Sequence, residues 1–349
     1  MVEPAHITCI MKRAFILGGT GQIGRAACKR LLTEGWSVTL ASRSSSTSLE
    51  INAHLKHITL DRTQNGKLSE ALGDGVNLLL DCIAYDPSHA DQLLEVESKV
   101  ENICVISSSS VYQDEDGRTL DEALFKGFPT FQSPIATNQP TVDAGESTYS
   151  TRKIAMEQRL LDRATVPITI LRPGAVYGPY GKHAREWFFV KRLLDGRRKI
   201  PLAYEGKSQF NTCSVEIIAE VILASASNAR STIMNVADPI APTVSEIGEA
   251  IMRHMGMNAE IVGLADVGYP PRAGASPWAI PRPIIITNSD SGVQSPGNYE
   301  DLVGSTVDWL IAETNKRPWQ EVVPELAAYP FDLFDYDAED RAILAESPL

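Results

Sequence analysis

Cysteine and histidine are sparse in this 349-residue chain, and their spacing excludes two kinds of site. The five cysteines show no CxxC pair and no cluster with histidine, so we expect neither a disulfide framework nor a zinc or other metal site. Cys82 and Cys104 fall in apolar runs, where a free cysteine behaves as a small buried hydrophobe. This cysteine usage favours a reducing, cytoplasmic location.

Positive charge is also in short supply. The net charge of −12 argues against a nucleic-acid partner, because phosphate backbones are bound by clustered Lys and Arg. The most basic stretch, residues 191–199, is interpreted as a solvated helix face and turn. The expected partner is therefore a small-molecule substrate.

Long apolar runs are lacking as well. No run approaches the roughly 18 residues of a membrane span, so no membrane partner is expected. The N-terminus lacks a basic region followed by an apolar core, which argues against a secretory signal. Because Met11 directly precedes a strand pattern, residues 1–10 are expected to be a disordered extension.

Short apolar, β-branched runs alternate with longer helical patterns in the first half of the chain. Runs without polar alternation are typical of strands that are buried on both faces of a parallel sheet. The pattern predicts an α/β fold with a Rossmann-type doubly wound parallel sheet over residues 11–180, completed by about 208–237. The expected strands are 14–18, 37–42, 57–61, 77–84, 103–108 and 168–174, and the expected helices are 22–34, 88–98 and 149–164.

The second half changes character. Proline-rich connections such as 269–283 resist regular structure and separate the helical patterns. The expected helices of this half are 184–195, 215–227, 244–256 and 299–313, and we expect residues 181–207 and 238–349 to form a smaller, irregular α/β substrate-binding part. The aromatic and acidic stretch 329–344 suits packing on this chain or on a partner subunit, and the sequence leaves both open.

The stretch "AFILGGTGQIGRAACKRLLTEG" (14–35) places closely spaced glycines between an apolar strand and a helical pattern. Glycines allow the backbone to turn tightly and to approach a pyrophosphate, while the helix N-terminus supplies N–H donors. This context predicts a dinucleotide site. Its expected contacts are Gly18, Thr20, Gly21, Gln22, Ile23 and Gly24.

The end of the second strand indicates which dinucleotide binds. NAD sites usually place an acidic residue there, but none occurs between Val38 and Leu49. Arg43, beside Ser42, suits a 2′-phosphate, so NADP is expected, with NAD as the alternative. Asp61, at the end of the third strand, is expected either to accept from the adenine amino group or to stabilise a turn.

Two further patterns point to chemistry. A serine run follows the strand at 103–108, and ligands bind beyond the carboxyl ends of strands in such sheets. Tyr149 and Lys153 are four residues apart, so on a helix they share one face and could form an acid/base pair.

Taken together, these segments resemble the extended short-chain dehydrogenase/reductases, the NAD(P)-dependent epimerase/dehydratase group. The resemblance covers about residues 12–312. The matching motifs are "GGTGQIG" (18–24), "DR" (61–62), "ISSSSVY" (106–112), "YSTRKIAMEQ" (149–158), "LRPGAVYGP" (171–179), "GKSQFNTCSVEIIA" (206–219), "MNVAD" (234–238) and "TVDWL" (306–310).

The resemblance implies roles for individual residues. Tyr149 would be the general acid/base, Lys153 would favour its phenolate and hold the nicotinamide ribose, and Ser108 would orient the substrate oxygen, with Ser109 as runner-up. Further cofactor contacts implied by the resemblance are Arg62, Cys82, Ile83, Ala84, Pro173 and Val176.

Some positions depart from the family pattern. The 4,6-dehydratases follow the active serine or threonine with an Asp-Glu pair, whereas Ser109 and Ser110 stand here, so a dehydratase is disfavoured. The segment 125–147 is longer than usual and is expected to be a loop near the substrate. Glu216 either replaces the family's acid or caps a helix. Candidate substrate contacts, from position alone, are Arg185, Trp187, Tyr204, Gln209 and Arg272.

The expected activity is that of an NAD(P)-dependent oxidoreductase with a dissociable cofactor. It would act on a carbonyl or secondary alcohol of a polar, nucleotide-sugar-like substrate. The alternatives are an NAD-dependent sugar-nucleotide epimerase and, from another class, a non-catalytic dinucleotide-sensing or RNA-binding relative. Members of this family often pair two helices into a homodimer, and the sequence leaves that open.

Overall fold

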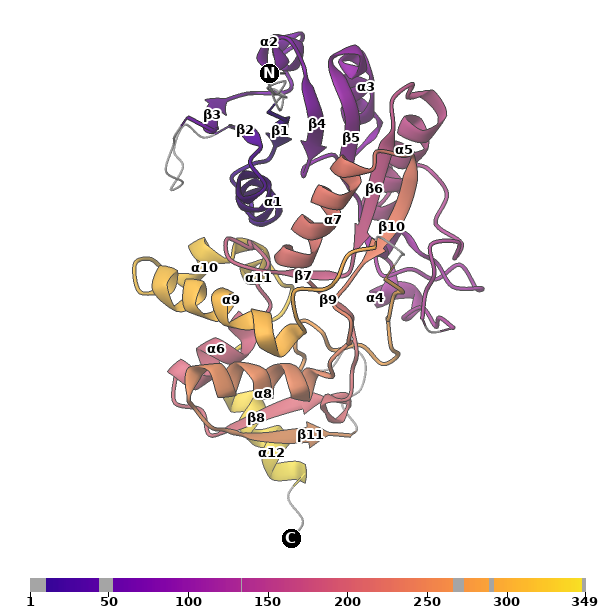
Figure 1. Ribbon diagram of the computed structural model, residues 1–349. Coiled ribbons are helices and arrows are strands. Elements are labelled where there is room, and N and C mark those ends of the chain that lie inside the picture. The colour runs from indigo at the N-terminus through magenta and orange to yellow at the C-terminus, as the bar shows by residue number, and fades with distance from the viewer. Residues whose placement is uncertain (1–10, 44–52, 133, 266–272, 289–291, 347–349) are drawn as a thin grey trace, which may run out of the picture.

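The computed structural model describes residues 11–43, 53–132, 134–265, 273–288 and 292–346. Its centre is a seven-stranded sheet of order β10-β6-β5-β4-β1-β2-β3, in which every neighbouring pair is parallel (Figure 1). The predicted doubly wound parallel sheet is therefore confirmed. Its strands are β1 (Arg13–Leu17), β2 (Ser37–Ser42), β3 (Leu55–Thr59), β4 (Val76–Asp81), β5 (Val100–Ile106), β6 (Ile168–Pro173) and β10 (Thr232–Val236).

Helices cover both faces of this sheet because each strand alternates its apolar side chains between two cores. In β1, Ala14 and Ile16 pack toward one face, while Phe15 and Leu17 pack toward the other. The first face is covered by α1 (Gln22–Thr33) and α7 (Val215–Ser227), and the second by α2 (Lys67–Leu72), α3 (Pro87–Glu95) and α5 (Tyr149–Arg163). Ligand-facing loops are left at the carboxyl ends of the strands.

The second half forms a smaller α/β unit below the sheet in the view of Figure 1. Its core gathers Trp187, Phe188 and Phe189 of α6 against the helices α8 and α9. Its elements are β7 (Ala175–Tyr177), α6 (Trp187–Leu194), β8 (Lys199–Ala203), β9 (Thr212–Ser214), α8 (Val244–Met255), β11 (Glu260–Leu264), α9 (Tyr299–Thr314), α10 (Trp319–Val322), α11 (Pro324–Ala327) and α12 (Tyr336–Glu346).

The interpretation of 191–199 as a solvated face is wrong for Arg192, which has no exposed surface. Its guanidinium donates to the carboxylate of Glu339 in α12 and to the backbone oxygens of Phe188 and Leu333. A buried guanidinium needs such partners, and most of them lie more than 140 residues away in sequence. The tail at 329–344 thus packs on its own chain.

The segment 125–147 begins within the short helix α4 (Ala123–Lys126) and forms no further helix or strand in its described residues. It is nevertheless anchored at two places. Ile135 N donates to the carbonyl of Ile285 at 2.7 Å, which ties the segment to residues 273–288. Val142 N donates to the carbonyl of Val111 at 2.9 Å, which holds it against the loop that follows β5.

Three predictions concern residues that lie partly or wholly outside the described ranges. They are the disordered extension 1–10, the substrate contact Arg272 and the proline-rich connection 269–283. Within the described ranges, no helix is both long and apolar enough to cross a bilayer. In the same ranges, no group of His, Cys, Asp and Glu is arranged to hold a metal ion.

Candidate active site

A cavity of about 650 Å³ opens at the carboxyl ends of the central strands, where a doubly wound sheet binds its ligands. It is bounded by the turn after β1 and by the ends of β2, β3 and β4. The predicted cofactor residues that line it are Gly18, Thr20, Gly21, Gln22, Ile23, Gly24, Ser42, Arg43, Asp61, Arg62, Cys82 and Ile83. The four remaining predicted cofactor contacts do not line this cavity; they are Ala84, Lys153, Pro173 and Val176.

Two glycines of the first turn, Gly24 and Gly21, are explained by different surroundings. A Cβ at Gly24 would lie 2.6 Å from the carbonyl oxygen of Gly18, so α1 packs here on bare backbone. A Cβ at Gly21 would meet nothing nearer than 3.4 Å, because this residue borders the cavity. Gly21 is the N-cap of α1 and makes no side-chain cap, which leaves the helix N-terminus available to an anion. The turn therefore fits a pyrophosphate.

At the ends of β2 and β3 the structure tests the adenosine contacts. Asp61 Oδ1 accepts from the backbone N and the hydroxyl of Thr63, at 3.0 and 2.7 Å, so the turn alternative for Asp61 is realised. Hydrogen bonds from Thr63, together with the charge of Arg43, lower the pKa of Asp61. The Ser42 hydroxyl shares a 2.8 Å hydrogen bond with His57. Arg43 is exposed on the cavity rim, where it could reach a 2′-phosphate.

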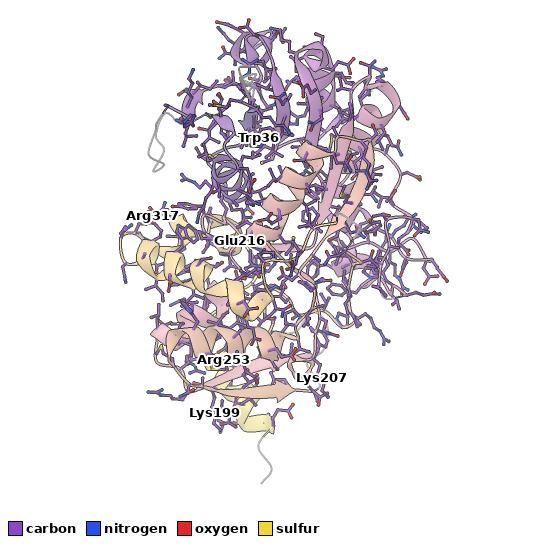
Figure 2. All side chains as sticks on the ribbon, viewed as in Figure 1. Trp36, Lys199, Lys207, Glu216, Arg253 and Arg317 are labelled. Atoms are coloured by element: carbon purple, nitrogen blue, oxygen red, sulfur yellow. The ribbon has the colours of Figure 1, made fainter. Side chains whose placement is uncertain are left out.

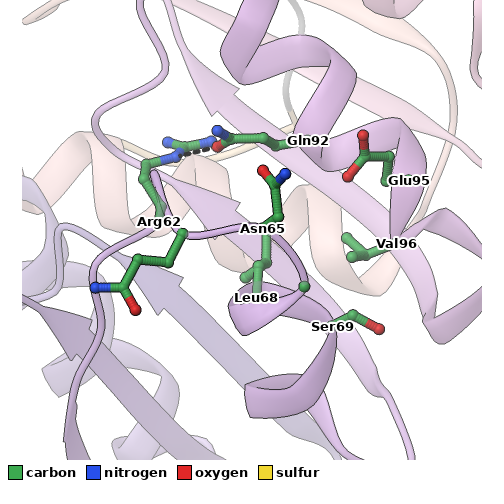
Figure 3. Close-up of a pocket in the computed structure, with 9 residues that line it drawn as sticks. Arg62, Asn65, Leu68, Ser69, Gln92, Glu95 and Val96 are labelled. Atoms are coloured by element: carbon green, nitrogen blue, oxygen red, sulfur yellow. Dashed lines mark hydrogen bonds between the residues drawn. The ribbon is translucent and has the colours of Figure 1, made fainter.

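Arg62 has a structural role that the sequence did not suggest. Its guanidinium forms a buried ion pair with Asp81 at 2.6 Å and donates to Gln92 at 2.7 Å. Arg62 and Gln92 point toward one another beside a smaller cavity of about 150 Å³ (Figure 3). Asp81 also accepts from Ile83 N at 2.9 Å. The pair therefore holds the loop that borders the cofactor cavity. An acid inside the apolar run "NLLLDCIA" was the available signal, because a buried carboxylate needs a partner.

Helix α5 presents the tyrosine and the lysine as their spacing predicted. A capping box between Thr148 and Thr151 starts the helix at Tyr149. Lys153 is 5% exposed, and its ammonium lies 5.5 Å from the centre of the Tyr149 ring. The ring of Tyr85, which the sequence reasoning missed, lies 5.6 Å from that of Tyr149.

The ammonium of Lys153 donates to two backbone carbonyls, those of Ala84 at 2.5 Å and Ile106 at 2.8 Å. Ile106 ends β5 and Ala84 lies in the loop after β4, so the lysine connects these two strand ends to the helix that carries Tyr149. Burial lowers the pKa of Lys153 to about 8, although the negative charges of Asp81 and Glu157 oppose that fall.

Ser108 lies close to Tyr149 at the start of α5. Its hydroxyl donates to that of Ser110 at 2.9 Å, and Ser110 in turn accepts from the Ser150 hydroxyl of α5. Ser109, the runner-up, is buried at 6% exposure. These bonds connect the serine run to the first turn of α5, so Ser108 and Tyr149 are brought together from segments forty residues apart.

Several groups act on the phenol of Tyr149. Although Tyr149 is 43% exposed, desolvation of its hydroxyl raises its pKa to about 12, and the hydrogen bond with Ser108 opposes the rise. The charge of Asp121, the neighbouring Tyr85 and the charge of Glu325 all raise the pKa further. A phenol with a raised pKa stays protonated near neutral pH, and a nearby cation is needed to favour its phenolate.

Among the described residues, none of the candidate substrate contacts lines the cavity. Trp187 is a buried core residue, and Gln209 donates to the carbonyl of Ala241 at 2.8 Å. The guanidinium of Arg185 lies 5.9 Å from the ring of Phe210. The residues of the second half that do line the cavity are Tyr180, Lys182, His183 and Glu325. The first three directly follow the motif "LRPGAVYGP", which was the signal available for them.

Glu216 lies in the first turn of α7, where the two halves of the molecule meet (Figure 2). The N-cap of α7 is Ser214, whose hydroxyl accepts from Ile217 N at 3.0 Å. Glu216 is therefore not the helix cap. Burial raises the pKa of its carboxyl.

A glycine turn before a helix, a cavity at the strand ends and a nearby Tyr/Lys/Ser group fit a dinucleotide-binding site with candidate acid/base residues. Residues 14–237 match the NAD dependent epimerase/dehydratase family, which is more than half of the chain. The chain belongs to that family, as its resemblance predicted. Family membership makes an enzyme the expected kind of protein and NAD the family's cofactor.

Solved structures agree in fold. The UDP-N-acetylglucosamine 4-epimerase of Methanobrevibacter ruminantium M1, in complex with UDP-N-acetylmuramic acid, is 19% identical, with a TM-score of 0.65 over 87% of this chain and 99% of that one. The Thermotoga maritima UDP-glucose 4-epimerase with UDP-glucose is 18% identical, with a TM-score of 0.66 over 86% and 99%. The Bacillus anthracis dTDP-glucose 4,6-dehydratase, in complex with NAD, is 17% identical, with a TM-score of 0.64 over 89% and 99%. Proteins with curated descriptions give no significant match.

Proposed function

We propose that this protein is an NAD-dependent epimerase of a nucleotide sugar that acts by Tyr-assisted hydride transfer at a secondary alcohol. The single observation that supports it most is the grouping of Ser108, Tyr149 and Lys153, in which Lys153 donates to Ala84, the residue after the cavity-lining Cys82 and Ile83. Similar folds bound to UDP-sugars and NAD make a nucleotide sugar the first substrate class to test.

In the proposed reaction, Tyr149, Lys153 and Ser108 each have a different role. A bound nicotinamide would take up and return the hydride. Tyr149 would accept the hydroxyl proton as the alcohol is oxidised and return it when the carbonyl is reduced from the other face. Lys153 would favour the phenolate through its charge, and Ser108 would hold the substrate oxygen. The cavity wall would keep the oxidised intermediate in place between the two steps.

The serine run favours epimerisation over elimination of water. Elimination requires a group that removes a proton from carbon and another that protonates the departing hydroxyl. Ser109 and Ser110 follow Ser108 and carry no carboxylate. An epimerase needs no such acid, because one tyrosine serves both half-reactions.

Two measurements test the proposal. The purified protein is denatured and the released dinucleotide is quantified; one NAD per chain is expected, since an epimerase regenerates its cofactor in each cycle. The protein is also incubated with UDP-glucose, UDP-galactose and UDP-N-acetylglucosamine, and the C4 epimers are followed by proton NMR. An empty protein that converts none of the three overturns the proposal.

A reductase that exchanges NADPH is the second candidate, and Arg43 is the observation that favours it. The guanidinium is exposed at the end of β2, on the rim of the cavity. If it binds a 2′-phosphate, Arg43→Ala should weaken NADPH about tenfold and leave NADH unchanged, because only NADPH loses a charge-assisted contact. Equal effects on both cofactors would remove this candidate.

A further inference from the structure

The dinucleotide cavity has a second wall, to which the other half of the molecule contributes Tyr180, Lys182 and His183. This segment, 180–183, is packed on the start of α1. A Cβ at Gly181 would lie 2.8 Å from Oε1 of Gln22, the first residue of that helix. The guanidinium of Arg25, three residues further along α1, lies 4.1 Å from the centre of the Tyr180 ring. Segment 180–183 therefore lies beside the helix N-terminus that fits a pyrophosphate.

The C-terminal part of the chain holds this segment in place. The backbone N of Glu325 in α11 donates to the carbonyl of Lys182 at 3.2 Å. Nε2 of His183 shares a 2.8 Å hydrogen bond with the hydroxyl of Tyr329, and the two ring centres lie 5.5 Å apart. Both partners lie beyond the residues that match the family. The His183 ring is thus fixed where the cavity wall and the C-terminal segment meet.

The surroundings of His183 define its charge and leave one ring nitrogen for a ligand. Burial and the charge of Arg185 lower the pKa of His183 to about 3, so the ring is neutral near pH 7. A neutral imidazole has one N–H donor and one acceptor nitrogen. Tyr329 engages Nε2, and among the described residues no hydrogen bond engages Nδ1. When the Tyr329 hydroxyl donates to Nε2, the ring proton lies on Nδ1.

A diphosphate is the ligand group that suits these donors. Its oxygens carry negative charge and only accept hydrogen bonds, so a binding site must supply N–H or O–H groups. The cavity supplies the uncapped N-terminus of α1 on one wall and the exposed Lys182 with the His183 ring on the other. The acidic Glu325 lines the same wall and can only accept at neutral pH, so it cannot replace a donor.

We propose that His183 donates a hydrogen bond from Nδ1 to the diphosphate of the bound dinucleotide, and that Tyr329 is the positioning residue that fixes the tautomer able to do so. The diphosphate then lies between the N-terminus of α1 and segment 180–183, where both halves of the molecule hold it. The inference concerns the cofactor and does not depend on which sugar is converted.

NADH dissociation constants, measured by fluorescence titration, test the contact. His183→Ala should weaken NADH about tenfold, because a hydrogen bond to a charged group is lost. ADP-ribose, measured as a competitor, should weaken equally, since it carries the same diphosphate. His183→Asn should stay within about threefold of the wild type, because its amide N–H can replace Nδ1–H. The matched control is His254→Ala, which removes a histidine that bonds Asp308 and does not line the cavity.

Tyr329→Phe tests the positioning role. NADH should weaken about three- to fivefold in the wild-type background, because the ring proton is no longer held on Nδ1. In the His183→Asn background the same change should matter less than about twofold, because an amide has no second tautomer. Tyr336→Phe is the control: it removes a hydroxyl that bonds Asp195 in the same part of the chain and should leave NADH unchanged. Equal losses in the two backgrounds overturn the positioning role.

The remaining outcomes separate this inference from the proposed function. Melting temperatures establish that each variant is folded. Equal NADH affinity in the wild type, His183→Ala and His254→Ala overturns the contact. A loss for UDP-glucose without a loss for NADH and ADP-ribose also overturns it, because His183 would then bind a substrate diphosphate. A wild type that binds no NADH overturns both proposals, whereas NADH binding without sugar conversion overturns the proposed function alone.

Discussion

The ammonium of Lys153 lies 5.5 Å from the ring centre of Tyr149, one turn along α5. The same ammonium donates to the carbonyls of Ala84 and Ile106. One buried cation thus connects Tyr149 to the carboxyl ends of β4 and β5. Burial lowers the pKa of Lys153, so its ammonium loses a proton at a lower pH than the ammonium of a free lysine. Substitutions of Tyr149 and Lys153 therefore test both the reaction and the stability of the fold.

Tyr149→Phe removes the proton carrier and keeps the ring. We expect kcat to fall by about 10²- to 10⁴-fold, the usual contribution of a general acid/base. NADH affinity and the melting temperature should be unchanged, since the phenyl ring keeps its contact with Tyr85. Tyr85→Phe is the matched control and should retain activity within a few fold. Undiminished turnover in Tyr149→Phe would remove the tyrosine from the mechanism.

Two alanine substitutions separate packing from binding in the glycine turn. Gly24→Ala forces a Cβ against the Gly18 carbonyl at 2.6 Å and should destabilise the fold by about 1–3 kcal/mol. Gly21→Ala has room in the fold but intrudes on the cavity, so it should weaken NADH at least tenfold while the free energy of unfolding stays within about 0.5 kcal/mol. Urea unfolding and fluorescence titration measure the two effects. Equal stability of the two variants would contradict this assignment.

Lys153→Met exposes the pH dependence of the buried cation. The folded-state pKa of about 8 lies below the 10.5 of a free lysine, so between these values the unfolded chain binds more protons. Wild-type stability relative to Lys153→Met should therefore rise by about 3 kcal/mol from pH 8 to 10.5, and this gain is lost as the pH falls back through that window. Unfolding of both proteins at several pH values measures the difference. A constant difference across that range would show that the lysine is not held neutral by burial.

The buried pair of Arg192 and Glu339 predicts that α12 stabilises the substrate half. Glu339→Gln leaves a guanidinium without its counter-charge and should cost about 3–5 kcal/mol in urea unfolding. Asp340→Asn is the control, because Asp340 is 55% exposed in its pair with Arg197 and should cost under about 1 kcal/mol. The double change Arg192→Met with Glu339→Leu should recover much of the loss. A small effect of Glu339→Gln would mean that α12 contributes little.

Local patterns determined the sheet, the glycine turn and the pairing of Tyr149 with Lys153. Each of these depends on residues close in sequence: apolar runs form buried strands, a glycine cluster opens a helix, and a spacing of four places two side chains on one helical face. These are properties of short segments, so they can be recognised before the chain folds.

Only the tertiary structure decided the remaining partners. Arg62 with Asp81, Arg192 with Glu339, and Glu325 beside the cofactor cavity all join segments that no periodicity relates. A buried charge requires a counter-charge, and a cavity wall requires a second surface, but neither requirement says which distant residue supplies it. The sequence by itself therefore determined the glycine turn after the first strand and the helical face that carries Tyr149 and Lys153. The folded chain decided which residues close the site around them, because that depends on how the two halves pack.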